Sequence, residues 1–225
     1  MRRREFSGGL IAVALGPLGS TDAQALGESD AAQGVRAALE RGALAAVALL
    51  GRTDGFLGNP RVRIALPGAL EQVAKLLRAT GQGRTIDELV TAMNRAAEIA
   101  VPQARSLFVS TIKALSVEDA LAIVRGGGTS VTDFFERKTR TPLATKFLPI
   151  VTRATEKVKL AERYNALAGK AAGLGLVKGD EANLQRYVTS RALDGLYLTI
   201  GDEEKKIRAD PVATGSAILR QVFGR

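Results

Sequence analysis

The stretch TIDELVTAMNRAAEIAVPQARSLFVSTIKAL, residues 85–115, has the clearest structural pattern in this chain. Its apolar residues recur at spacings of three and four, so at about 100° per residue they fall in one narrow arc of a helix. The pattern predicts a helix that faces the core of the protein, and Pro102 predicts a kink or a restart within it. The apolar arc consists of Ile86, Leu89, Val90, Met93, Ala97, Ala100, Ala104, Leu107, Thr111 and Leu115.

A second arc of the same helix is polar and is the first candidate for a binding site. It contains Asn94, Glu98 and Arg105, with Arg95 at its margin. An arginine–carboxylate pair beside an asparagine amide could hold the polar head group of a ligand while the apolar arc holds its tail. The alternative is a solvated face on which Arg95 and Glu98 form an ordinary ion pair three residues apart.

Helical patterns follow one another along the rest of the chain, and nothing in the sequence predicts a parallel sheet. We therefore expect an all-α fold, with a single bundle-like domain of about nine or ten helices over residues 26–225. Capping residues and first-turn prolines mark where these helices should begin. The expected starts are a cap at Asp30, Pro67, a capping box of Thr85 with Glu88, Pro142 after Thr141, and Pro211 after Asp210.

Residues 61–66, RVRIAL, depart from the helical pattern. The apolar side chains of Val62, Ile64 and Leu66 alternate with two arginines, which is the period of an extended chain. The flanking prolines favour an edge strand or an isolated extended segment. Because the sequence offers no second strand to pair with it, we expect this segment to lie across the helices.

The composition excludes several classes of chemistry. The chain has 225 residues, of which 46% are hydrophobic and 24% charged, as is ordinary for a globular protein. It contains no cysteine and no histidine, which excludes thiolate or imidazole metal sites, cysteine nucleophiles and a histidine base. A metal site would need oxygen ligands alone, and no aspartate-rich calcium loop is present. We expect no metal and no cofactor.

The N-terminus has the three parts of an export signal, over residues 1–25. Arg2 to Arg4 form a basic start, residues 8–19 are small and apolar, and Ala23-Gln24-Ala25 is a cleavage signal. Within it, Arg3-Arg4-Glu5-Phe6 resembles the core of a twin-arginine signal; the alternative is a general secretory signal with a chance arginine pair. These features predict a periplasmic protein, cleaved near Ala25.

Two classes of partner are disfavoured by this signal. The apolar run at residues 8–19 is too short to cross a bilayer, so we do not expect a transmembrane protein. The net charge of +9 would suit nucleic acid, but export would separate the protein from it. Anionic lipids and other proteins of the envelope remain as expected partners.

A basic run provides the second candidate site. Residues 130–172 hold nine cations against four acids, and on a helix Lys146, Arg153 and Lys157 would lie within about 40° of one another. Arg137 and Lys138 belong to the same run. Such a stripe could contact anionic lipid head groups at about 1 kcal/mol per cation. The alternative is a solvated basic face.

Several blocks of the sequence resemble one bacterial family of exported proteins. They are FLGNPRVRIALPGAL (56–70), MNRAAEIAVPQA (93–104), KFLPIV (146–151), YNALAGKAAGLGLVK (164–178), YVTSRALDGLYLTIGDEEKKIRADP (187–211) and ILRQVFG (218–224). Over about residues 30–224 the chain resembles the domain-of-unknown-function family numbered 4197. The resemblance implies an α-helical periplasmic protein, and it brings no established activity, ligand or catalytic residue.

Three classes of function remain open. The first is a periplasmic helical binding protein for an apolar or amphipathic anionic molecule, such as a lipid. The second is an envelope structural or protein-interaction protein without a small ligand, which an exposed apolar patch would favour. The third is a hydrolase-type enzyme that uses carboxylates, which a cleft of groups with shifted pKa values would favour. No serine or carboxylate pair is distinguished by its setting, so the sequence names no catalytic residue.

Overall fold

The structure, a computed structural model, describes residues 20–156, 158–162, 164–166 and 179–210. These ranges contain seven α-helices, two 3-10 helices and no strand, which confirms the all-α fold. Residues 159–162 and 164–166 are also helical. The elements are α1 (Ser20–Leu50), α2 (Gly68–Ala79), α3 (Gly83–Ala100), η1 (Val101–Gln103), α4 (Ala104–Lys113), α5 (Val117–Arg125), α6 (Ser130–Thr155), η2 (Gly179–Ala182) and α8 (Leu184–Ala209).

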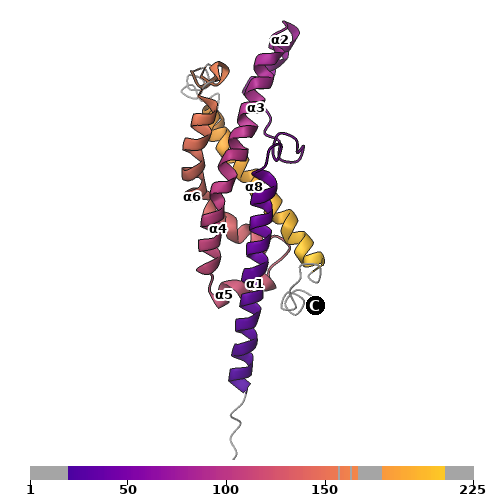
Figure 1. Cartoon of the computed structure of the whole chain (residues 1–225), viewed down its shortest axis with the longest axis vertical. Coiled ribbons are helices and arrows are strands. Elements are labelled where there is room, and N and C mark those ends of the chain that lie inside the picture. The colour runs from indigo at the N-terminus through magenta and orange to yellow at the C-terminus, as the bar shows by residue number, and fades with distance from the viewer. Residues whose placement is uncertain (1–19, 157, 163, 167–178, 211–225) are drawn as a thin grey trace, which may run out of the picture.

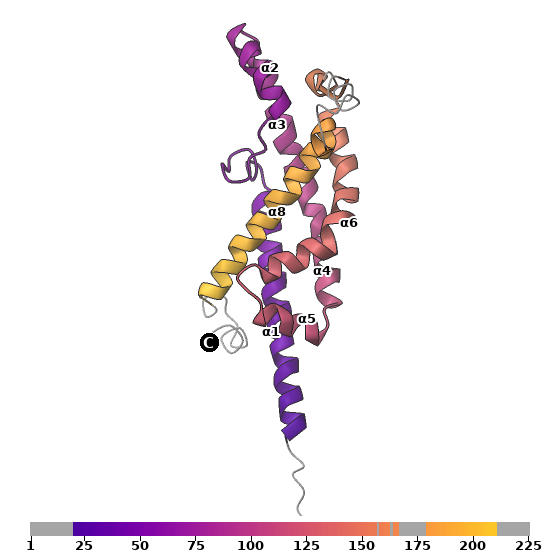
Figure 2. The ribbon, with the colours of Figure 1, turned by 180° about the vertical axis from the view of Figure 1, so that it is seen from behind.

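The helices form an elongated bundle (Figure 1). The first part of α1 projects from one end of it and α2 from the other. Between these ends, α1 packs against α4, α5 and α8, while α6 packs against α3 and α8. Seen from behind, α8 crosses the other helices diagonally, so that one of its faces lies on the outside of the bundle (Figure 2).

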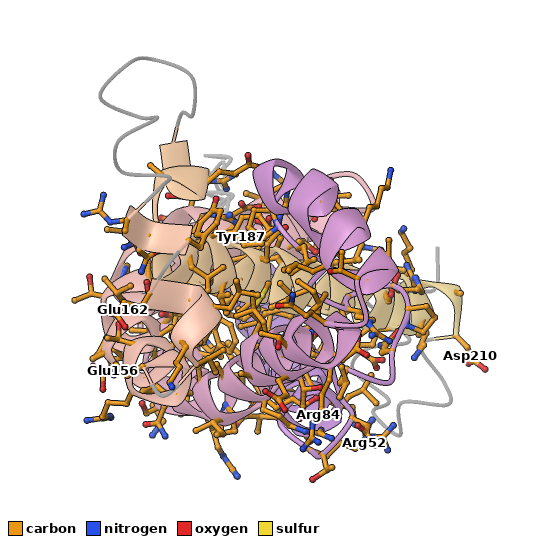
Figure 3. All side chains as sticks on the ribbon, turned by 90° about the horizontal axis from the view of Figure 1, so that it is seen from above. Arg52, Arg84, Glu156, Glu162, Tyr187 and Asp210 are labelled. Atoms are coloured by element: carbon orange, nitrogen blue, oxygen red, sulfur yellow. The ribbon has the colours of Figure 1, made fainter. Side chains whose placement is uncertain are left out.

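One continuous cluster of buried side chains joins these helices. Phe56, Phe108, Phe135 and Phe147 are fully buried within it, and the rings of Phe108 and Phe135 meet edge to face with centroids 4.9 Å apart. The view along the bundle shows the same division between inside and outside (Figure 3). Tyr187 lies among the packed side chains, whereas the labelled arginine, glutamate and aspartate side chains project at the rim.

The core arc predicted for the central helix is confirmed on α3 and changes after Pro102. On α3, every apolar residue of the predicted arc is buried. Pro102 lies in the single 3-10 turn η1, beyond which α4 buries Ala104, Phe108 and Ile112. Leu107 and Thr111, expected in the core, are only partly buried. The buried face changes because α4 packs against α1 as well as α6, whereas α3 packs against α2, α6 and α8.

The expected nine or ten helices are wrong for the described residues, chiefly because α6 is one helix. Pro142 was expected to begin a helix, yet both Pro142 and Pro149 lie inside α6. Both prolines are exposed, as are Lys138 and Thr145 four residues before them, so water can bond the carbonyl groups that lose an amide partner. Packing of every fourth residue against the neighbouring helices keeps α6 continuous; these residues are Phe135, Thr139, Leu143, Phe147, Val151 and Thr155.

Two other expected helix starts are wrong. Asp30 lies inside α1, which begins at Ser20. The capping box of Thr85 with Glu88 does not form, because α3 already begins at Gly83 and its first turn has no side-chain cap. A helix can begin before a suitable capping residue when the preceding residues can also adopt helical geometry. Such a residue therefore marks only one of several places where a helix can begin.

Some sequence predictions fall outside the described residues. Most of the predicted export signal, residues 1–19, lies there, as do Lys157 and the helix expected after Pro211. The predicted cleavage site at Ala25 lies within α1 of the full chain, and cleavage stays a prediction. No helix in the described part of the chain is both long enough and apolar enough to cross a membrane.

Candidate functional site

Asn94, the first residue of the predicted polar site, is fully buried and bonded to backbone. Its side-chain oxygen accepts the amide of Ile64 at 2.8 Å, and its side-chain nitrogen donates to the carbonyl of Ile64 at 2.9 Å and to that of Val90 at 2.8 Å. The amide of Asn94 therefore bonds the extended segment as a neighbouring strand would. Val62, Ile64 and Leu66 are buried there, as the alternation predicts.

Glu98, one turn further along α3, holds the loop before that segment. Its carboxylate accepts the backbone amides of Phe56 at 3.0 Å and Leu57 at 3.1 Å, and a hydrogen bond from Arg95 at 2.6 Å. Arg95 also bonds Asp54 at 2.8 Å. The hydrogen bonds to Glu98 and then Asp54 raise the pKa of Arg95 above its usual value. Asn94 and Glu98 thus brace the chain between α1 and α2.

Arg105, the fourth residue of that predicted site, lies apart from the other three. It is exposed on α4, and within the described ranges no acid pairs with it. It borders a shallow hollow with Pro102, Ser106, Val109 and Lys113. The structure therefore brings together Asn94, Arg95 and Glu98, and it does not bring Arg105 to them.

The basic stripe on α6 is exposed where the structure describes it. Arg137, Lys138, Lys146 and Arg153 all face solvent, and none of them pairs with an acid of the described segments. Lys157 lies outside those segments. Because Lys138 and Lys146 are two turns apart with Pro142 between them, they share one exposed ridge of the helix.

A groove between α6 and α8 has the size and chemistry of a ligand site. Its volume is about 450 Å³, within the range of small-molecule pockets. Ala144 and Leu148 of α6 and Leu193 of α8 give it apolar walls. Polar side chains line the rest; they are Arg140, Thr141, Thr145, Asp180, Arg186, Thr189 and Ser190.

Thr189 is the unusual residue of this groove. The residue is only 4% exposed, and within the described part of the chain its hydroxyl has no hydrogen-bond partner. Arg186 and Ser190 lie on the same face of α8, three residues before it and one after it. Arg186 is exposed, and no described acid lies within ion-pair distance of it. A buried hydroxyl without a partner is uncommon in folded proteins, so this one calls for an explanation.

The sequence gives only a weak signal for this groove. The spacing of three and four residues puts Arg186, Thr189, Ser190 and Leu193 on one helix face. The residues between them are equally ordinary on a helix, so nothing in the sequence distinguishes this face. The groove exists because α6 packs against this face of α8, and that packing could not be read from either helix alone. The helix-face spacing was the one signal available.

Arg140 lies at the boundary between the groove and a second hollow, which Glu136, Asp194 and Tyr197 also line. It bonds Glu136 at 2.8 Å and also Asp194, and its guanidinium lies 5.8 Å from the centre of the Tyr197 ring. Burial opposes the charge of Arg140, but the hydrogen bond to Asp194 and the nearby acids outweigh it, so the pKa of Arg140 is above its usual value. Arg140 is therefore a fixed cation at the edge of both hollows.

A family model described as "Protein of unknown function (DUF4197)" matches residues 25–224. The chain belongs to this family. The DUF4197 match spans both α6 and α8, so the groove lies wholly within the matched part. No curated protein and no solved structure matches the chain.

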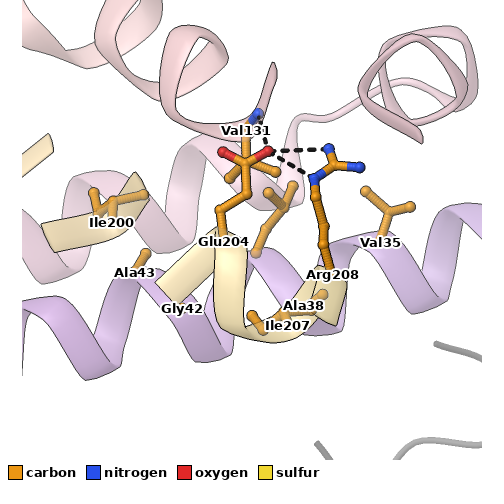
Figure 4. Close-up of a pocket in the computed structure, with 10 residues that line it drawn as sticks. Val35, Ala38, Gly42, Ala43, Val131, Ile200, Glu204, Ile207 and Arg208 are labelled. Atoms are coloured by element: carbon orange, nitrogen blue, oxygen red, sulfur yellow. Dashed lines mark hydrogen bonds and ion pairs between the residues drawn. The ribbon is translucent and has the colours of Figure 1, made fainter. Parts of the chain in front are cut away.

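A smaller cavity of this DUF4197 chain lies between α1, α6 and α8 (Figure 4). Its volume is about 20 Å³, which is room for about one water molecule. At its edge the buried Glu204 accepts the backbone amides of Val131 and Thr132, both at 3.1 Å, and pairs with Arg208 at 3.0 Å. Glu204 thereby caps the first turn of α6, which is a structural role rather than a binding role.

The burial of Tyr197, which lies beside Arg140, leads to a prediction for the behaviour of this DUF4197 chain at alkaline pH. Burial raises the pKa of Tyr197 from 10.0 to about 12. Because the folded state favours the neutral phenol, this contribution to stability is complete below about pH 10 and is lost as the pH rises towards 12. We expect the tyrosinate absorbance of the folded protein to show a late step that Tyr197→Phe removes. An unchanged titration in that variant would contradict the assignment.

Proposed function

We propose that the protein binds an amphipathic anion in the cell envelope, and that the groove between α6 and α8 is its binding site. The observation that carries this proposal is the buried Thr189 hydroxyl, which has no partner in a groove of ligand size. Leaving such a group unsatisfied costs about 1–3 kcal/mol. A ligand oxygen that accepts its hydrogen bond would recover that free energy.

The charges around the groove favour an anionic head group. Among the described residues that line it, Arg140 and Arg186 stand against one acid, Asp180. Arg140 is already shared between Glu136 and Asp194, so Arg186 is the cation with free donors. An oxyanion near Arg186 could also accept from the hydroxyl groups of Thr189 and Ser190. The apolar walls would then contact the hydrocarbon part of the ligand.

The basic ridge of α6 supports the same function. Lys138 and Lys146 lie on the helix that forms one wall of the groove, and both lack an acidic partner within the described residues. Exposed cations attract anionic surfaces at about 1 kcal/mol each near a membrane. They would therefore concentrate the protein where amphipathic anions occur. The export signal predicted for residues 1–25 supports a periplasmic location for this activity.

The interaction-protein alternative has less support. It calls for a contiguous apolar surface. The large apolar side chains that are exposed in the described residues are Ile99, Val117 and Leu198, and they lie on three different helices. The groove is the more specific feature, because it combines a cavity, an unsatisfied hydroxyl and a free arginine.

Calorimetric titration of the mature protein with dodecyl phosphate, below its micelle concentration, tests the proposal. We expect binding that Arg186→Ala weakens about tenfold or more, because one charge-assisted hydrogen bond is lost. The matched control is Arg125→Ala, an exposed cation of α5 that does not line the groove, which should bind as the native protein does. Inorganic phosphate should bind more weakly, since it lacks the hydrocarbon chain. Equal binding of dodecyltrimethylammonium would contradict an anion site.

Thr189→Val separates stability from binding. The valine keeps the shape of the side chain and removes a buried hydroxyl that has no partner, so the ligand-free protein should be as stable as the native one or up to about 1 kcal/mol more stable. Binding of dodecyl phosphate should nevertheless weaken, while Thr189→Ser should retain it. Thermal melts and calorimetry measure the two effects. A clear loss of stability in Thr189→Val would show that the hydroxyl has a structural partner after all.

A further inference from the structure

The segment at residues 61–66, predicted to be extended, begins in a turn in which the amides of Val62 and Arg63 bond the carbonyl of Asn59 at 3.2 and 2.8 Å. From residue 63 on it is bonded to helix side chains, and part of its backbone stays open. Ile64 exchanges both of its backbone hydrogen bonds with the side chain of Asn94 on α3. On the side of α8, the carbonyl of Ala65 accepts the hydroxyl of Tyr187 at 3.1 Å. No described group bonds the amide of Ala65 or the carbonyl of Arg63. Successive residues of an extended chain direct these groups to opposite edges, so the open groups face away from Asn94.

A hollow of about 290 Å³ lies beside this open edge, between the segment and α8. Its walls include Arg61, Arg63 and Ala65 of the segment and Tyr187, Arg191 and Leu198 of α8. Leu198 is 43% exposed there and adds an apolar surface. The hollow thus offers backbone groups, cations and an apolar contact within one short stretch.

The charges of the hollow are mostly positive. Arg63 is exposed, and no acid of the described residues pairs with it. Arg61 pairs with Asp202 at 2.5 Å. Arg191 lies 5.3 Å from the centre of the Tyr187 ring and 3.6 Å from Asp194. An occupant with carboxylates would therefore find one free arginine and two that are exposed enough to be shared.

We propose that this hollow docks an extended, acidic segment of a partner protein, which adds to the open edge as a strand. Main-chain bonds to Ala65 and Arg63 would give affinity that does not depend on sequence, and alternate side chains would give specificity. Carboxylates on one face of the partner segment would pair with the arginines. An apolar side chain would contact Leu198. This interaction is separate from the groove between α6 and α8 and does not depend on it.

The edge is held in shape before any partner arrives. Glu98 and Asn94 fix the chain before and within the segment, as described above. Gly195 brings α8 close to it, since a side-chain carbon at that position would lie 3.2 Å from the Cβ atom of Val62 and 2.8 Å from the ring of Phe56 in the loop before it. A docking edge that is already ordered loses little conformational entropy on binding, which favours affinity.

Fluorescence anisotropy with a labelled peptide of alternating aspartate and valine tests this proposal on the mature protein. We expect binding, and we expect no binding of the peptide with lysine in place of aspartate. A peptide of the same sequence with its valine amides methylated should bind about tenfold more weakly, because main-chain bonds are lost. If the methylated peptide binds as well as the unmodified one, strand addition is wrong.

Two variants locate the site. Arg63→Glu should weaken the aspartate–valine peptide about tenfold or more, whereas Arg153→Glu on α6 should leave its binding unchanged. Ala65→Pro should also weaken binding of the aspartate–valine peptide, because it removes the open amide. Ile64 keeps the extended conformation that a following proline prefers. Equal losses in Arg63→Glu and Arg153→Glu would overturn the proposal, because they would indicate general charge attraction. If Ala65→Pro fails to fold, the methylated peptide on the native chain still decides.

Discussion

Replacing Glu98 with alanine should destabilise the folded protein by about 3–5 kcal/mol, the cost of breaking a buried charged network. The carboxylate of Glu98 is the acceptor for the amides of Phe56 and Leu57 and for Arg95. Without it, the amides of Phe56 and Leu57 lose their acceptor in a setting from which water is largely excluded, whereas Arg95 keeps its bond to Asp54. Urea unfolding followed by circular dichroism measures the change.

Glu88 provides the matched control on the same helix. It pairs with Arg84 at 3.1 Å, but its side chain is 59% exposed, so water replaces the lost partner. Glu88→Ala should cost less than about 1 kcal/mol. Glu98→Gln should fall between the two, because the amide keeps one acceptor oxygen and loses the charge. A Glu98→Ala variant as stable as Glu88→Ala would show that the loop before the extended segment does not depend on this carboxylate.

The structural role of Glu98 is repeated elsewhere in this fold, by Glu204. Among the described residues, these two are the buried glutamates. Each accepts two successive backbone amides from a distant part of the chain, and each pairs with an arginine one turn away on its own helix. In both cases the carboxylate joins one helix to the start of another segment. Both acids therefore belong to the framework of the fold.

The sequence could predict features that depend on local periodicity. The buried arc of α3 and the alternation of Val62, Ile64 and Leu66 follow from residues a few positions apart, and the structure confirms both. The role of Asn94 and Glu98 could not be predicted in this way. Their partners are backbone groups 30 to 42 positions away, and a backbone group leaves no mark in the sequence.

The predicted polar arc of α3 was placed apart from the core-facing arc, and its two interpretations were a ligand site and a solvated face. The structure instead buries Asn94 and Glu98 and bonds both to backbone groups of the preceding loop and segment. Only the fold identified these partners. The groove of Thr189 likewise depends on the fold, because its residues look ordinary until α6 packs against α8 and encloses the hydroxyl.

Asn94→Ala should cost about 3 kcal/mol or more, and its effect should be concentrated at one place. Alanine leaves the buried amide and carbonyl of Ile64 without partners, at about 1–3 kcal/mol for each unsatisfied group. It also leaves a small cavity beside Met93 on α3, which adds to the loss. Hydrogen exchange should show the Ile64 amide losing its protection first, before the core of α3 and α8 opens.

Two further variants define what Asn94 does. Asn94→Asp keeps an oxygen that can accept from Ile64 but cannot donate to its carbonyl, and it buries a charge with no cation, so it should be no more stable than Asn94→Ala. Thr91→Ala, an exposed change one turn earlier on α3, should alter stability by less than about 0.5 kcal/mol. If Asn94→Ala left the exchange of Ile64 unchanged, the segment would be held by its other contacts, such as its buried apolar side chains and the bond from Tyr187 to Ala65. Asn94 would then not be the residue that fixes the open edge beside α8.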